Sequence, residues 1–209
     1  MQRYTVIRIF VLLCVILSLV LAVLGVLMPF FETPADISLT IRFLTDLLQS
    51  PGFSVSEGRP LLERFGHLVS GPPAKSKMTL WGMTYGSSGA TNTINLRDEY
   101  FTCYLGNMLI QSAEGMAVVT CVLGTANVIM AFFLLFFPSV VKFPLTAYLF
   151  FAAVAAAVTF GFTLHLYLHG WCATPALHAS EWHVSKGFIF FVISCTLSLI
   201  ASVLTLVFT

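Results

Sequence analysis

The chain has 209 residues, of which 58% are hydrophobic and 9% charged, and its net charge is +1. An ordinary soluble domain carries about 25% charged residues, so this chain has too few ionised side chains to solvate a globule of its size and needs a bilayer. The composition excludes a soluble enzyme, a disordered chain and a nucleic-acid binder, because the last of these needs a basic surface.

Four apolar stretches are long enough to cross a membrane. Crossing about 30 Å of hydrocarbon takes roughly 20 apolar residues in a helix, and a bilayer offers backbone groups no partner outside the helix. The predicted transmembrane helices cover residues 9–28, 116–137, 145–168 and 187–208. The first is too long for the core of a signal peptide and ends in no small-residue cleavage motif, so we expect it to remain uncleaved.

The charged residues predict which way the helices face. Arg3 and Arg8 lie in the N-terminal segment 1–8, and Lys142 is the only charge in the loop 138–144, whereas all nine carboxylates fall in or beside the other two loops. Short cytoplasmic segments carry an excess of Lys and Arg. We therefore predict cytoplasmic termini, a large extracellular loop over residues 29–113 and a small one over residues 169–186.

The large loop contains patterns of both helix and strand. Thr33-Pro34-Ala35-Asp36 is typical of a helix start, and Pro60 to Val69 carries apolar residues at helical spacing. Lys77 to Tyr85 predicts a strand, and Gly86 to Asn95 a polar loop. The predicted fold class is an all-α membrane protein, a four-helix bundle with a small extracellular β-sheet and short helices in the first outer loop.

The five cysteines divide by depth. Cys14, Cys121 and Cys195 lie in predicted membrane helices, where a thiol is usually an inert apolar group. Cys103 and Cys172 lie one in each outer loop, in an oxidising compartment. We predict a disulfide between them, which requires α-carbons within about 4.4–6.8 Å.

Small and hydroxyl residues recur every four positions along two of the helices. Helices in lipid pack through such residues, so we interpret each set as a packing face; a polar conduction stripe along the serines is the alternative. The sets are Ala153, Ala157 and Gly161 in the third helix and Ser194, Ser198 and Ser202 in the fourth. Asn127 is interpreted as a hydrogen-bond partner of a neighbouring helix, and the binding of a solute is the alternative.

A cluster of titratable residues gathers near the outer interface. Glu114 and His165 are predicted there, where the cost of an ionised group falls away, and they are candidates to pair. His165 and His169 have the i, i+4 spacing of two-histidine metal pairs, and with His183 or Glu181 they would form a Zn or Cu site. Ordinary interfacial histidines give the same pattern, so both interpretations stay open.

Enzyme motifs are absent from the sequence. It has no Gly-rich phosphate loop, Cys-x-x-Cys, Gly-x-Ser-x-Gly or paired carboxylates, and no marked nucleophile with its base. We expect neither an enzymatic activity nor a cofactor.

The segment Thr79-Leu80-Trp81-Gly82, together with the four-helix topology, resembles the signature of amastins, tetraspan surface proteins of kinetoplastid parasites. Cys103, the run Glu114 to Val118 and Cys172 are similar to the family's outer-loop cysteines and its entry into the second helix. Lys77 and Ser87 stand where the signature has cysteines.

The resemblance covers Met78 to the C-terminus and the first helix, and residues 32–70 look like an added segment. Amastins are distantly similar to claudins, which have four helices and a Trp-bearing outer sheet. The resemblance implies a plasma-membrane protein of host–parasite or membrane–membrane contact, without enzymatic activity. Its expected partners are the lipid bilayer, further copies of the chain and a host-cell surface molecule, with Trp81 as an anchor in the sheet or at the membrane interface.

A second function remains open on the residues alone. A four-helix proton or metal-ion transporter or channel would use Glu114 and His165.

Overall fold

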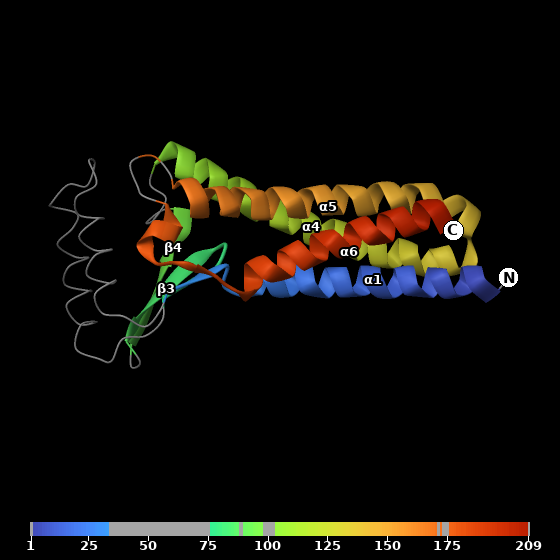
Figure 1. The fold of residues 1–209 in the computed structure, drawn as a ribbon, viewed down its shortest axis with the longest axis horizontal. Helices are drawn as coiled ribbons and strands as arrows, with labels where there is room; N and C mark the ends of the chain where they lie inside the picture. Colours follow the sequence, from blue (N-terminus) through green and yellow to red (C-terminus); the bar gives the residue numbers. More distant parts are fainter. Residues whose placement is uncertain are drawn as a thin grey trace.

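The computed structural model describes residues 2–33, 76–87, 90–97, 103–170, 172 and 176–208. Four helices form an elongated bundle, a small sheet lies at one end of it, and both termini lie at the other (Figure 1). We call these the sheet end and the terminal end.

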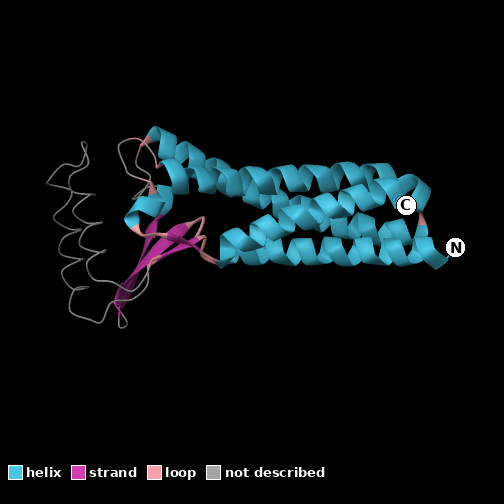
Figure 2. Cartoon of the chain, in the orientation of Figure 1, coloured by secondary structure: helices cyan, strands magenta, loops and turns pink. Residues whose placement is uncertain are grey.

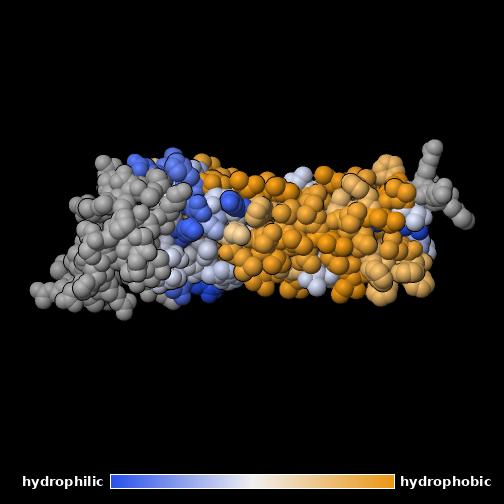
Figure 3. Space-filling model, turned by 90° about the horizontal axis from the view of Figure 1, so that it is seen from below, coloured by the Kyte–Doolittle hydropathy of each residue, from blue (hydrophilic) through white to orange (hydrophobic). Residues whose placement is uncertain are grey.

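The four helices are those that the apolar stretches predict. They are α1 (Gln2–Leu27), α4 (Tyr104–Phe136), α5 (Pro138–His169) and α6 (Lys186–Phe208). All four are long and apolar enough to cross a membrane, and apolar residues form a belt along the bundle (Figure 3). α1 packs against α4 and α6, and α5 packs against the same two helices. The predicted tetraspan bundle is confirmed.

Three helices begin well before the predicted residues, and the first of them, α1, begins at Gln2 and not at residue 9. α4 begins at Tyr104 and not at residue 116, and the predicted loop 138–144 is wrong, because these residues form the first turns of α5 and only Phe137 separates the two helices. Pro138 suits the start of a helix, where its missing N–H has no partner to lose. A helix of 33 residues is about 50 Å long, so α4 extends beyond the roughly 30 Å of hydrocarbon.

The sheet has five short antiparallel strands (Figure 2). In the order β4-β3-β2-β1-β5, they are β4 (Ala90–Asn95), β3 (Gly82–Ser87), β2 (Lys77–Met78), β1 (Phe31–Glu32) and β5 (His183–Val184). The predicted single strand Lys77 to Tyr85 is thus a hairpin, β2–β3. The predicted loop Gly86 to Asn95 is wrong over most of its length, because pairing with β3 extends this polar segment into β4.

The residues on either side of the long segment between β1 and β2 lie side by side in the sheet. Phe31 pairs with Met78 and Glu32 with Lys77. One step further, the Thr33 amide donates to the Ser76 carbonyl (3.0 Å), and the Ser76 amide donates to Thr33 Oγ1 (3.2 Å). Residues 34–75, including the short helices predicted there, lie outside the described residues. Their two attachment points meet as in a hairpin.

One hydrophobic core joins the sheet to the bundle. This junction core contains Leu80, Met83 and Leu96 from the sheet region together with Ile110 and Phe191 from α4 and α6. Burying a Leu or Met side chain from water contributes roughly 1.5–3 kcal/mol. The sheet is therefore docked on the helices by its own buried side chains. A second core, near the terminal end, is formed by helix residues alone: Val11, Cys14, Val15, Ala131, Leu134, Leu145, Leu149 and Ala201.

Candidate functional site at the sheet–bundle junction

The residues Thr79 to Gly82 form the turn between β2 and β3. Thr79 Oγ1 accepts hydrogen bonds from the amides of Trp81 (3.3 Å) and Gly82 (3.1 Å) and donates to the Gly82 carbonyl (2.9 Å). A hydroxyl that bonds backbone two or three residues on favours a turn over a continued strand. A Cβ at Gly82 would lie 3.0 Å from the Ile94 carbonyl of β4, which explains the glycine.

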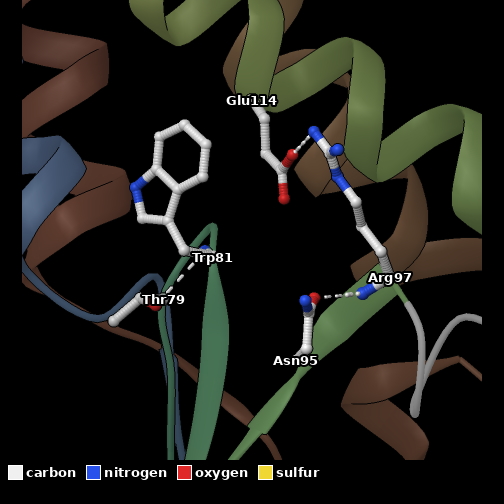
Figure 4. A network of polar contacts seen from close by, with 5 residues as sticks. All are labelled: Thr79, Trp81, Asn95, Arg97 and Glu114. Atoms are coloured by element: carbon white, nitrogen blue, oxygen red, sulfur yellow. Dashed lines mark hydrogen bonds and ion pairs between the residues drawn. The ribbon is translucent and has the colours of Figure 1, made fainter.

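The two central residues of this turn have opposite environments. Leu80 is 1% exposed and belongs to the junction core, whereas Trp81 is 43% exposed. The Trp81 indole extends from the turn toward the helices (Figure 4). A half-exposed Trp where a sheet meets an apolar helix bundle is typical of the aromatic belt at a membrane interface.

An ion pair connects the end of β4 to α4. Arg97 Nη2 donates to Glu114 Oε2, and the Arg97 amide donates to Asn95 Oδ1 at 3.0 Å (Figure 4). The Glu114 side chain is 3% exposed and that of Arg97 is 40% exposed. A buried carboxylate needs a partner to remain charged. The structure pairs Glu114 with Arg97 and not with His165, the partner suggested by the sequence.

The disulfide between Cys103 and Cys172 is present, as predicted, with α-carbons 6.8 Å apart. Cys103 is the extended residue directly before α4, and Cys172 follows Gly170, which ends α5. The bond therefore ties the sheet ends of α4 and α5 together. Together with the junction core and the Arg97–Glu114 pair, it stabilises the sheet end of the bundle.

These features surround the segment that resembles a family signature, and comparison with known families agrees. The chain matches the family model described as Amastin surface glycoprotein over residues 62–205. The chain belongs to the amastin family. The matched range includes the hairpin, the disulfide and three of the four helices, and it leaves α1 and β1 outside. No curated protein matches this amastin.

The histidines of this amastin do not assemble into the three-ligand metal site that the sequence suggested. His165 and His169 are exposed on α5 with their rings stacked, 4.8 Å between centroids. His183 is exposed on β5, opposite Glu32. Within the part of the chain that the structure describes, no three His, Cys, Asp or Glu side chains form a group that could hold a metal ion.

The serines of α6 bond to neighbouring helices. Ser18 Oγ of α1 lies 3.0 Å from Ser194 Oγ and 2.8 Å from Ser198 Oγ, and Ser194 Oγ donates to the Ser18 carbonyl (2.8 Å). Ser202 Oγ donates to the Thr146 carbonyl of α5 (3.2 Å). Each of these hydroxyls forms a hydrogen bond between two helices.

The predicted packing face of α5 is present in part. Cys195 Sγ of α6 contacts the Ala153 carbonyl at 3.4 Å, and Ala157 packs against the junction core. Gly161 makes no close approach, because a Cβ there would meet no atom within 4 Å. Asn127 Nδ2 donates to the Tyr148 carbonyl of α5 in a long bond of 3.4 Å, in line with the interpretation from sequence.

Arg97 and the two glycines at the contact between α1 and α6 are not among the residues predicted from the sequence. The sequence predicts Glu114 at the outer interface, where an ionised group costs little, so the need of this carboxylate for a cation follows only from its burial in the folded chain. A Cβ at Gly187 would lie 2.6 Å from the Met28 carbonyl, and a Cβ at Gly25 would collide with the Phe191 ring. Isolated glycines without a repeat give no pattern to detect.

Proposed function

We propose that this amastin is a non-enzymatic surface protein of the plasma membrane that mediates contact between membranes, including contact between parasite and host. Its termini face the cytoplasm, and its sheet end carries the contacting segment, residues 34–75, outside the cell. The observation that carries the proposal is the hairpin at Thr33 and Ser76, which attaches both ends of this segment to a sheet docked on the bundle.

The proposed orientation is supported at both ends of the molecule. The disulfide Cys103–Cys172 lies at the sheet end, and disulfides persist in oxidising, extracellular compartments. Arg8 and Lys142 lie in the first turns of α1 and α5, at the terminal end. Cytoplasmic flanks of membrane helices are enriched in such residues.

The polar side chains inside the bundle support a scaffold over a transporter. Ser18, Ser194 and Ser198 bond to one another, and Ser202 and Asn127 bond to backbone of α5. Polar contacts of this kind hold membrane helices together. The ion-transport alternative needs Glu114 and His165 on one path, but Glu114 is engaged by Arg97.

The test replaces residues 34–75 with Asn-Gly, which closes Thr33 and Ser76 into a two-residue hairpin. We expect the variant to keep its disulfide and its melting temperature in detergent, since the sheet register is unchanged. Adhesion of proteoliposomes to host-type membranes, or to each other, is expected to fall at least tenfold.

A matched control variant introduces the same Asn-Gly turn into the β3–β4 hairpin. Ser88→Asn creates Asn-Gly between Ser87 and Ala90, which pair at the end of the neighbouring β3–β4 hairpin. This variant should adhere like the parent protein. Full adhesion by a folded protein that lacks residues 34–75 would refute the proposed role of that segment.

A further inference from the structure

We propose that His165 and His169 form a binding site for a divalent transition metal, preferring Cu²⁺ over Zn²⁺, on the last turns of α5 at the sheet end. The site is independent of the contact function proposed above. It uses two protein ligands and therefore differs from the three-ligand cluster that the structure does not assemble.

The helix places the two imidazoles together. Residues four apart lie on the same face of a helix, and the two rings are near-parallel, at 17° with 4.8 Å between centroids. Both side chains are exposed. Among the described residues, each ring stacks on the other, and no hydrogen bond engages the ring nitrogens.

Two imidazoles at this spacing suit a small metal cation of borderline softness. Metal–nitrogen bonds of about 2.0–2.1 Å set the two ligating atoms roughly 3 Å apart, and two histidines four residues apart on a helix are a known arrangement for holding one metal ion. Imidazole favours Cu, Ni and Zn, and Cu²⁺ binds most tightly in the divalent series. Because the pair is exposed, water completes the coordination.

Two other described histidines provide the contrast. His178 Nδ1 lies 3.0 Å from the Tyr167 carbonyl, so one of its nitrogens is already engaged by backbone. His183 is held on β5 by pairing with β1. Neither has a stacked imidazole neighbour among the described residues, so they serve as controls that change the histidine content equally.

The experiment titrates the full-length, tag-free protein in detergent with Cu²⁺ or Zn²⁺ and follows the heat of binding. We expect one equivalent to bind, with Cu²⁺ tighter than Zn²⁺, and a higher melting temperature with metal because the ligand binds the folded state. His165→Ala and His169→Ala should each weaken binding at least tenfold, whereas His178→Ala and His183→Ala should leave it unchanged.

Electron paramagnetic resonance of bound Cu²⁺ separates this site from any other. The parent protein should show coupling to two imidazole nitrogens, and either single variant should show one. Because both side chains are exposed, the melting temperatures without metal should agree within about 2 °C. Unchanged Cu²⁺ affinity in the double variant, or an equal loss in His178→Ala, would overturn the proposal.

Discussion

Gly187→Ala is expected to force α1 and α6 apart and to lower the free energy of unfolding by about 3 kcal/mol, the upper end of the usual cost of overpacking. The added methyl would lie 2.6, 2.8 and 3.0 Å from the carbonyl oxygens of Met28, Pro29 and Gly25. All three are backbone atoms, so no side chain can rotate away. The Gly187 amide also donates to the Pro29 carbonyl (2.9 Å), which holds the helices at this distance.

The measurement is the unfolding free energy in mixed detergent micelles, with Gly161→Ala as the matched control. Gly161 is also a helical glycine, but a Cβ there meets no atom within 4 Å. Alanine has the higher helix propensity, so the control should be unchanged or more stable by up to about 1 kcal/mol. Equal effects of the two substitutions would refute the close α1–α6 contact.

Arg97→Ala is expected to lower the free energy of unfolding by about 2–4 kcal/mol. The substitution leaves the Glu114 carboxylate, 3% exposed, without its cation, and breaking a buried pair from one side costs about 3–5 kcal/mol. We expect a smaller loss than for a fully buried pair because Arg97 is 40% exposed, so water screens its interaction with Glu114.

A double-mutant cycle distinguishes the ion pair from packing. Replacing both partners, as in Arg97→Met with Glu114→Leu, should recover most of the lost stability, because no charge is left buried. Chemical unfolding of the parent, two single variants and the double variant gives the coupling energy. Additive losses would show that Arg97 and Glu114 act independently.

The sequence predicted the bundle because bilayer burial is a strong physical constraint. An apolar stretch of about 20 residues has few alternatives to a membrane helix, and all four were found where expected. Helix ends were harder, because α4 continues as a helix beyond its apolar part and α5 starts at Pro138 without a loop. Hydropathy marks the membrane-embedded part of a helix and not its full length.

The candidate site was predictable where local chemistry determines it. Cys103 and Cys172 followed from depth and compartment, and the Thr79–Gly82 segment from its resemblance to a family signature. The Arg97–Glu114 ion pair and the close contact of Gly187 with the end of α1 form between residues that approach one another only in the folded chain. The four-residue spacing of Ala153, Ala157 and Gly161 places them on one helix face, but spacing alone does not show how closely a neighbouring helix approaches each position.

The accessibility of inserted epitopes on intact cells tests the proposed topology most directly. One tag is placed within residues 34–75 and another after the C-terminus, which lies at the terminal end of the bundle (Figure 1). We expect antibody to label the first tag on intact cells and to reach the second only after permeabilisation. Labelling of both tags on intact cells would contradict the proposed topology and, with it, the contact function.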